Sequence, residues 1–457
     1  YYSHKPNGSP AYFKYPGLKP TGPLPASVDF PLYPQKEPDK FRAVIFADPQ
    51  PRDNKEVEFV GHDVIEELIG VDAAFGVSLG DIAFDNLNTF ATLNQKIALI
   101  GIPWYNVIGN HDLNQDSPDD QRSDETFEAT YGPNYYSFDY GPTHFMVLDD
   151  MKWVAPAPGA AKGFFLGEFG KTQLEWIKND LAQIPRNQMV VLMMHVPLVD
   201  EEGKFSPTGN RVTDRRDLYR LIEKRPFCLS ISGHTHYQEH KFISSADGWE
   251  GPEKHHHVVN VTVSGSWWSG LPDEKGIPHT TMRDGAPNGY SFLNFDGNKY
   301  SIDFKAARRP AEHQMNIYAP DEVLAAETGK VEVVVNVFGG SEKSKVEMKV
   351  GAGEWTPLRH EPRIDPYYAL LKERETVMLG AKKRLDPVLG YALPVAVPSA
   401  HLWVTNLPLN LPLGTHNIQI RTVDTFGRTY TDQRVVRVVE TLAVPKAAPA
   451  VEAKPVL

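Results

Sequence analysis

The chain has 457 residues, 41% hydrophobic and 23% charged, which is typical of a globular protein with two or three domains. Its formal net charge of −11 at pH 7 argues against a nucleic-acid-binding surface, because such a surface needs a basic patch. No apolar run is long enough for a transmembrane segment, and the single cysteine, Cys228, excludes an internal disulfide. Nothing in the composition indicates an oligomeric state.

Residues 1–40 are rich in Pro, Gly, Tyr and Lys and show neither helical nor strand periodicity. We expect them to form an extended linker or the remnant of an N-terminal module. Over residues 41–309, strand and helix patterns alternate, which predicts an α/β domain. Its strands are expected over residues 42–47, 73–79, 104–108, 144–148, 189–194, 227–232 and 257–263.

Three helices are predicted between these strands. The first covers residues 56–68, and the second buries one face over residues 87–97. The third is expected to start at Thr172, because Glu175 follows it at the spacing of a capping box. The domain then closes with a hairpin over residues 290–304, which has a turn at its centre.

Beyond residue 309, Gly, Pro and Asn turns separate a new set of strand patterns. Residues 310–440 are therefore predicted to form a C-terminal β-sandwich domain. Residues 441–457 are mostly Pro, Ala, Lys and Val, and we expect a disordered tail there. The expected strands of the sandwich are 331–338, 345–350, 415–422 and 429–439, with a short helix at 369–375.

Polar side chains follow five of the α/β strands at the points where those strands end. Ligand sites in α/β sheets form outside the strand ends, where the loops meet. Asp, Asn, Gln and His in this number suit two divalent metals. The blocks are Asp48-Pro49-Gln50, Gly80-Asp81 with Asp85, Gly109-Asn110-His111-Asp112, His195, and Gly233-His234-Thr235-His236.

A count of charges also favours two metals. Two divalent ions bring four positive charges, and Asp48 and Asp81 neutralise two of them, while Asn, Gln and neutral His neutralise none. The remaining charge suits a hydroxide between the metals and an anionic substrate. Because two metals about 3.5–4 Å apart activate water and bind phosphoryl oxygens, a small phosphorylated substrate is expected. The imidazole of His111 is suited to protonate the leaving group.

Taken in order, the blocks read D-x-[HQ], G-D-x-x-x-D, G-N-H-[DE], an isolated His and G-H-x-H. This set resembles the calcineurin-like metallophosphoesterases over most of the α/β domain. The resemblance implies two facing β-sheets flanked by helices, an αββα sandwich. It also implies that a centre of two metal ions hydrolyses phosphate esters, with a hydroxide that bridges the two metals attacking phosphorus.

The resemblance also implies a role for each matching residue. His111 would protonate the leaving oxygen, Asp112 would orient the His111 ring, and Asp85 would hold the loop of Asp81 or a metal-binding His. The metal ligands would be Asp48, Gln50 and His236 on the first ion, Asn110, His195 and His234 on the second, and Asp81 on both.

Gln50 departs from the family pattern, since most members have His at this position. An amide oxygen is a harder and weaker ligand than imidazole, which favours Mn or Fe over Zn. The Asp-x-Gln pattern of Asp48 and Gln50 also resembles the branch of the family that includes ADP-ribose/CDP-alcohol diphosphatases. Phosphodiester or pyrophosphate substrates are therefore slightly favoured over monoesters. Alternatively, Gln50 is only an outer hydrogen-bonding group. A half-empty site of that kind would fit a non-catalytic cell-surface binding protein with a degenerate phosphoesterase core.

Aromatic residues near the blocks are candidates for the substrate pocket. Tyr135 and Tyr136 could stack on a sugar or base, or pack under their own loop. Either Trp267 or Trp268 could line the pocket, and burial in the core is the alternative for both. The run His255-His256-His257 is not expected to bind one metal, because neighbouring strand residues point to opposite faces of a sheet.

The layout of the whole chain resembles a set of bacterial secreted calcineurin-like phosphohydrolases. These have an N-terminal β-module, the phosphoesterase core and a C-terminal β-domain. The resemblance implies a signal peptide and a β-module upstream of Tyr1, and a periplasmic or secreted location. The stretches that carry it are Pro23–Phe30, Asn134–Phe138, Gly265–Trp268 and Asp424–Thr429.

Overall fold

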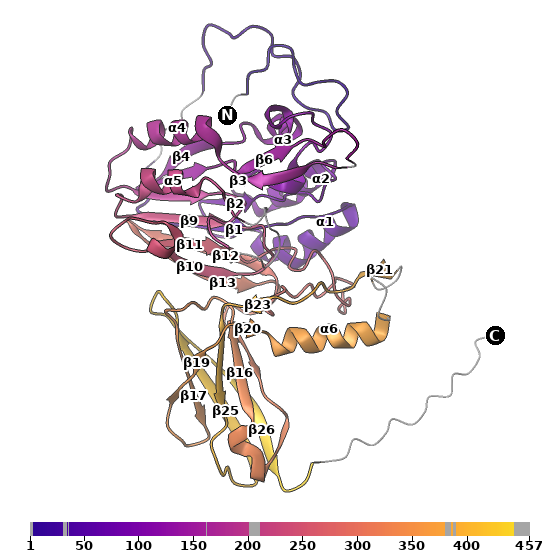
Figure 1. Cartoon of the computed structure of the whole chain (residues 1–457), viewed down its shortest axis with the longest axis vertical. Coiled ribbons are helices and arrows are strands. Elements are labelled where there is room, and N and C mark those ends of the chain that lie inside the picture. Colours follow the sequence, from indigo (N-terminus) through magenta and orange to yellow (C-terminus); the bar gives the residue numbers. More distant parts are fainter. Residues whose placement is uncertain are drawn as a thin grey trace, which may run out of the picture.

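The structure, a computed structural model, describes residues 3–30, 34, 36–160, 162–200, 211–379, 385–386 and 390–442. Two β-sheets and their helices form one body, and a strand-rich domain forms the other (Figure 1). Helix α6 (Pro366–Leu379) extends sideways where the two bodies join (Figure 1). The predicted combination of an α/β core with a C-terminal β-domain is confirmed.

Each of the two core sheets contains a set of parallel strands. Strands β1, β2 and β3 run parallel in the first sheet, and β5, β8, β9 and β11 run parallel in the second. The loops after these strands therefore leave from the same end of each sheet. The first sheet has the order β13 (Lys299–Ala306), β12 (Gly289–Asp296), β1 (Lys40–Phe46), β2 (Phe75–Leu79) and β3 (Trp104–Val107). The second has the order β10 (Glu239–Ile243), β11 (His255–Val259), β9 (Cys228–Ser232), β8 (Met189–Met193), β5 (Thr143–Val147) and β4 (Tyr136–Tyr140).

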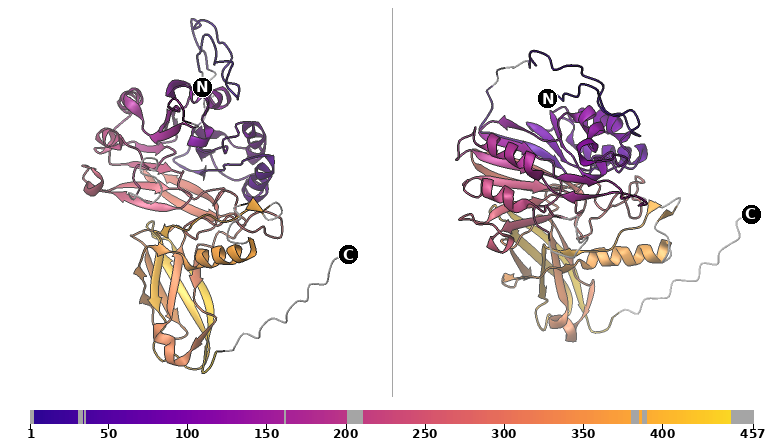
Figure 2. Two further views of the ribbon diagram at one scale, coloured as in Figure 1. Left: turned by 45° about the vertical axis from the view of Figure 1, so that its right-hand side comes forward. Right: turned by 45° about the horizontal axis from the view of Figure 1, so that its top comes forward.

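The sheets pack face to face because the apolar residues of their strands alternate between two cores. Ile45 of β1 and Val191 of β8 belong to the core between the sheets. Val44 and Phe46, the neighbours of Ile45, point the other way and join the core under the helices. Helices cover the two outer sides of the pair of sheets (Figure 2). This is the predicted αββα arrangement.

The helices follow the apolar periodicity, but their ends differ from the prediction. Helix α1 (Asn54–Val60) continues as a π-helix (Gly61–Ile65) and a 3-10 turn (Glu66–Leu68). The observed helix therefore begins two residues before the predicted start at residue 56. Helix α2 (Thr89–Ile97) buries the predicted face. The remaining core helices are α3 (Glu125–Tyr131), α4 (Gly170–Leu181) and α5 (Arg215–Ile222).

The capping box predicted at Thr172 is wrong, because α4 begins two residues before it. The carboxylate of Asp214 accepts hydrogen bonds from the backbone N–H groups of Phe169 and Gly170, at 3.1 and 2.9 Å. A residue more than 40 positions away in the sequence therefore binds the first free N–H groups of this helix.

The C-terminal domain is a sandwich of two sheets. Its core is formed by residues such as Val335, Trp403 and Ile420. One sheet has the order β14 (Met315–Tyr318), β16 (Glu332–Val337), β24 (Leu402–Asn406) and β19 (Arg359–His360). The other has the order β15 (Glu322–Leu324), β26 (Thr429–Val439), β25 (Gly414–Val423), β17 (Lys345–Val350) and β18 (Thr356–Pro357).

A buried polar network joins the sandwich to the core. The carboxylate of Asp284 lies 3.0 Å from Nε2 of His401 and accepts a hydrogen bond from the backbone N–H of Gln238 at 2.8 Å. The side-chain amide of Asn336 donates to the carbonyl of Asp284 at 3.0 Å. Because Asp284 lies in the long segment between β11 and β12, the sandwich is attached directly to that segment.

The N-terminal segment has no regular secondary structure and arches over the top of the core, above α3 (Figures 1 and 2). Lys5 and Ser9 both bind the buried carboxylate of Glu125 in α3. Tyr15 is buried, and its hydroxyl donates to the backbone carbonyl of Asp85 at 3.0 Å. Most of the predicted tail, residues 443–457, lies outside the described residues. Among the described residues, no helix has the length and apolar character needed to cross a membrane.

Candidate metal centre

The residues predicted to bind metal meet where β1, β2, β3, β8 and β9 end. Because β1, β2 and β3 are parallel, their ends lie at one edge of the first sheet, and the ends of β8 and β9 lie at one edge of the second. The two sheets pack face to face, so the loops after these two edges meet. All of these side chains are buried except that of His234, which is half-buried. The group consists of Asp48, Gln50, Asp81, Asn110, His195, His234 and His236.

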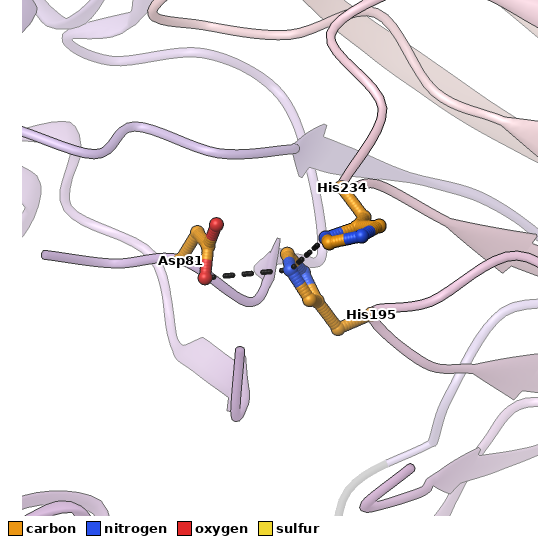
Figure 3. A group of neighbouring side chains, drawn as sticks. All are labelled: Asp81, His195 and His234. Atoms are coloured by element: carbon orange, nitrogen blue, oxygen red, sulfur yellow. Dashed lines mark hydrogen bonds and ion pairs between the residues drawn. The ribbon is translucent and has the colours of Figure 1, made fainter. Parts of the chain in front are cut away.

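Three side chains form the tightest part of this group (Figure 3). Nε2 of His195 lies 3.3 Å from Oδ1 of Asp81 and 3.2 Å from Nδ1 of His234. The possible ligand atoms of the three residues all lie within 4.8 Å of one another. Oδ1 of Asn110 is also 3.2 Å from the same nitrogen of His195.

Backbone carbonyls fix the orientation of two of the imidazole rings. Nδ1 of His195 lies 2.8 Å from the carbonyl of Leu79, and Nδ1 of His236 lies 2.5 Å from the carbonyl of Gly265. A carbonyl only accepts, so each Nδ1 must carry the proton. In the neutral form of each ring, Nε2 is therefore the unprotonated nitrogen, and it points toward the cluster, as metal binding requires.

Gln50 provides a direct test of whether the cluster suits a cation. Its amide nitrogen donates to Oδ2 of Asp81 at 2.9 Å. Its Oε1 is buried and has no hydrogen-bond partner among the described residues. A buried acceptor without a donor is costly, whereas a divalent cation would satisfy it. With the carboxylates and the two oriented imidazoles, this oxygen completes a donor set that fits divalent metals.

The backbone at the centre is unusual, because many of its non-glycine residues have positive φ. This left-handed conformation costs free energy in residues with a Cβ and is concentrated at functional sites. The surrounding loops hold these residues in place and aim their side chains inward. The residues with positive φ are Asp48, Gln50, Asp81, Asp85, His234, His236 and Trp267.

The carboxylates and histidines of the cluster strongly shift each other's pKa values. Burial, followed by the charge of Asp81, raises the pKa of Asp48 to about 7. Burial also opposes ionisation of Asp81, but the charges of His195 and His111 hold its pKa below the usual range. Burial opposes the charge on His195, yet Asp81 and Asp48 raise its pKa to about 10. The field that holds a proton on His195 would equally hold a metal cation.

His111 lies beside this cluster and not among its ligands. Its Nδ1 is 2.6 Å from Oδ1 of Asp85, and its ring stacks on Phe84 with 4.4 Å between centroids. Burial disfavours the protonated ring, but the charge of Asp81 and the hydrogen bond to Asp85 raise the pKa of His111 above its ordinary value. A proton on this ring is therefore available for donation.

The expectation that Asp112 orients His111 is wrong. Both carboxylate oxygens of Asp112 are buried and accept backbone hydrogen bonds from Gly109, Ile82 and Ala83, at 2.9 to 3.1 Å. Asp112 thus ties the loop after β2 to the loop after β3. Asp85, expected only to hold a loop, is the carboxylate that contacts the His111 ring.

A cavity of about 480 Å³ opens over the cluster and His111. Of the four aromatic candidates, Trp267 lines it and stacks on His236, with 3.9 Å between ring centroids. Trp268 is buried beneath the site, where its Nε1 donates to the carbonyl of Pro49 at 2.9 Å. The alternative of core burial therefore holds for Trp268 and not for Trp267.

The two tyrosine candidates lie elsewhere. Tyr136 is buried between the sheets, and its hydroxyl is 3.2 Å from both the backbone nitrogen and the carbonyl oxygen of Asn106. Tyr135 packs edge-on against Trp176 of α4, with 5.1 Å between centroids. The expectation that these rings line the substrate pocket is thus corrected, and the packing alternative describes both.

The hairpin that borders the cavity was not among the pocket residues predicted from the sequence. This hairpin consists of β6 (Met151–Val154) and β7 (Phe164–Gly167). Trp153, Phe164 and Phe165 line the cavity, together with Lys162. Its strands have no motif or unusual periodicity, so only their aromatic content could have drawn attention to them.

Comparison with known families now adds to this geometry. The profile of the calcineurin-like phosphoesterase family matches residues 42–238. A second profile, the C terminal of calcineurin-like phosphoesterase, matches residues 256–430. The chain therefore belongs to the calcineurin-like phosphoesterase family, whose members are metal-dependent phosphoesterases. No curated protein matched the chain as a whole or in part.

Among solved structures, the chain is similar to the purple acid phosphatase PPD1 isolated from yellow lupin (Lupinus luteus) seeds. The identity is 17%, the TM-score is 0.41, and the match covers 60% of this chain and 52% of that chain. The chain thus spans about half the length of that protein. It is also similar to Escherichia coli alpha-2-macroglobulin activated by porcine elastase, with 11% identity, a TM-score of 0.16, and coverage of 44% and 19%.

Proposed function

We propose that the protein hydrolyses small phosphorylated substrates at a site that holds two divalent metal ions. The observation that carries this proposal is the group of seven possible metal ligands at neighbouring strand ends. One of them, Gln50, has a buried Oε1 with no hydrogen-bond donor among the described residues. Family membership supports the same class of reaction. Hydrolysis adds one water across a phosphorus–oxygen bond and yields an alcohol and a phosphate.

The resemblance to the family implies two sets of donors that share Asp81, and the contacts support this division. Oδ1 of Asp81 faces His195, while its Oδ2 accepts from the amide of Gln50. Asn110 and His234 lie beside His195, and Nε2 of His236 lies 3.7 Å from Oδ1 of Asp48. We therefore assign Asp48, Gln50 and His236 to one metal, Asn110, His195 and His234 to the other, and Asp81 to both.

The metals, when bound, would activate water and neutralise phosphoryl charge. The residues of the chain have separate tasks. His111 borders the cavity and donates a proton to the leaving oxygen. Asp85 accepts the Nδ1 proton of His111 and so leaves Nε2 to give up its proton. Phe84 restrains the plane of the ring by stacking.

We further propose Mn or Fe as the preferred metals, and phosphodiesters or pyrophosphates slightly ahead of monoesters. Gln50 supports the metals, because its amide oxygen is harder than the imidazole of most family members. The support for the substrates is the resemblance of Asp48-Pro49-Gln50 to the branch with ADP-ribose/CDP-alcohol diphosphatases. A periplasmic or secreted location is a proposal that rests on the family resemblance alone, and cell fractionation would test it.

The test of the function uses metal-stripped protein resupplied with Mn. A chromogenic phosphodiester and a chromogenic phosphomonoester are assayed with the wild type, His111→Ala and His416→Ala. His416 is a half-buried histidine of the sandwich whose ring contacts only the nearby carbonyl of Pro412 among the contacts described. We expect Mn to restore activity with both chromogens. On ethyl phosphate, whose alkoxide leaving group needs a proton, we expect His111→Ala to lose about 100-fold or more while His416→Ala retains activity.

Metal analysis distinguishes this proposal from the alternative hypothesis of a non-catalytic cell-surface binding protein. Two equivalents of bound transition metal support the enzyme. A folded protein that binds no metal and hydrolyses neither ester with any divalent ion would support the binding protein instead. Circular dichroism of each sample shows whether the fold is intact.

A further inference from the structure

The cavity over the metal site is much larger than a phosphate group. At about 480 Å³ it falls in the range of pockets that enclose a whole organic ligand. The proposed ligands and His111 occupy one part of its lining. The remainder must therefore contact the organic part of a substrate, and its chemistry indicates what that part is.

Aromatic side chains from two distant segments dominate this remainder. Trp153, Phe164 and Phe165 come from the β6–β7 hairpin, and Trp267 comes from the segment after β11. Planar rings of a ligand pack favourably on such surfaces, in stacked or edge-on geometry. Short alkyl groups gain less from them, because they cover less aromatic surface.

Two rings of the hairpin are held in fixed positions. The indole Nε1 of Trp153 donates to the carbonyl of Ser117 at 3.0 Å, and its backbone N–H donates to Asp120 at 2.5 Å. Phe165 meets His234 edge-on, with 5.6 Å between centroids. The hairpin thus contacts the segment after His111 on one side and His234, a proposed metal ligand, on the other.

Phe164 differs from these two rings because 53% of its surface is exposed. It lines the cavity from the same hairpin. A large apolar side chain exposed beside a site is a typical ligand contact, since covering it is favourable. Its exposure also means that it can be replaced without loss of core packing.

We propose that the substrates of this site carry a planar aromatic group close to the phosphorus, and that this group rests on the aromatic surface of the β6–β7 hairpin with Phe164 as its outermost contact. This inference deepens the proposed function and rests on it for the reaction. It adds the substrate class, namely phosphate esters whose organic group is a ring system.

A matched pair of monoesters tests the proposal. Benzyl phosphate and ethyl phosphate release alkoxides of similar basicity, so the difference in kcat/KM reports contacts of the ring. Each reaction consumes one water and gives the alcohol and inorganic phosphate. With Mn-loaded wild type we expect kcat/KM for benzyl phosphate to exceed that for ethyl phosphate by about tenfold.

Three variants locate the effect. Phe164→Ala should lower kcat/KM for benzyl phosphate by about fivefold to tenfold and leave that for ethyl phosphate within about twofold. Phe164→Tyr keeps the ring and should keep the preference. Phe227→Ala, which removes a partly exposed phenylalanine just before β9 at the end of the sheet away from the site, should change neither value.

A binding measurement separates failure of this inference from failure of the proposed function. Titration calorimetry with benzylphosphonate and ethylphosphonate needs no turnover. Tighter binding of benzylphosphonate that Phe164→Ala abolishes supports the aromatic site, even if no ester is hydrolysed. Equal binding of the two phosphonates, together with equal kcat/KM for the two esters, overturns the inference while hydrolysis of ethyl phosphate leaves the proposed function standing.

Discussion

At the scale of single residues, the pair formed by His111 and Asp85 is the feature most directly tied to chemistry. The pair is short, at 2.6 Å, and stands at the edge of the cavity. A carboxylate on Nδ1 fixes the tautomer and stabilises the protonated ring, which is what a general acid requires.

Asp85→Asn is expected to reduce kcat, and the reduction should depend on the leaving group. Poor leaving groups such as alkoxides need the proton of His111, whereas nitrophenolate hardly needs it. We expect a loss of about tenfold to 100-fold on alkyl esters and a much smaller loss on nitrophenyl esters. Asp72→Asn, at an exposed carboxylate outside the cavity, is the matched control. Equal losses on both ester types would contradict a role through His111.

Gln50 stands where the family pattern usually has His, and its Oε1 has no hydrogen-bond partner among the described residues. A substitution at this position tests whether Gln50 binds a metal. Gln50→His should shift metal preference from Mn toward Zn by about tenfold or more, because imidazole is the softer ligand. Competition between the two metals, followed by metal analysis, measures the shift, with Gln433→His in the sandwich as control. An unchanged preference would show that Gln50 is an outer hydrogen-bonding group.

At the scale of elements, helix α4 shows how a distant side chain can replace a local cap. The carboxylate of Asp214 accepts from the backbone N–H groups of Phe169 and Gly170. Thr172 and Glu175 have the spacing of a capping box but lie inside the helix. Spacing alone therefore suggested the wrong N-terminus.

The free energy of unfolding distinguishes these two residues. Asp214→Ala should lower it by about 1–2 kcal/mol, because two helix N–H groups lose their acceptor. Thr172→Ala should change it by less than about 0.5 kcal/mol, since threonine inside a helix contributes little. Urea denaturation of both variants measures the difference. A larger effect of Thr172→Ala would restore the capping-box interpretation.

At the scale of the whole molecule, two segments outside the loops with the polar blocks contact the surroundings of the site. The sandwich holds the segment that carries Trp267, since Nε of Arg283 donates to the carbonyl of Val395 and the N–H of Val397 donates to the carbonyl of Arg283. The N-terminal segment reaches the loop that carries Asp85, through the hydroxyl of Tyr15.

Two tyrosines test whether the N-terminal segment is part of the core. Tyr15 is buried with the apolar residues under the helices, whereas Tyr12 is 64% exposed. Tyr15→Ala should lower the free energy of unfolding by about 3 kcal/mol. Tyr12→Ala should have an effect below about 0.5 kcal/mol. Equal, small effects would mean that the segment only lies on the surface, as a linker would.

The prediction from sequence was most accurate where local pattern and function coincide. Apolar runs such as those of β8 and β9 predict strands because period and length decide between strand and helix. The proposed metal ligands could be selected because each directly follows a strand, and parallel strands end together. The structure places these residues in one cluster, and their individual roles at the metals stay predictions.

The sequence by itself therefore determined an α/β core, the C-terminal β-domain and the positions of the polar blocks, because these depend on short-range periodicity and on residues adjacent to strand ends. The facing of two sheets was implied by the resemblance of those blocks to the family. Only the tertiary structure decided that Asp85 and not Asp112 contacts His111, that Trp267 and not Trp268 lines the cavity, and that the β6–β7 hairpin supplies the aromatic surface. Each of these depends on which side a loop faces and on contacts between residues far apart in the chain. No local pattern records such contacts.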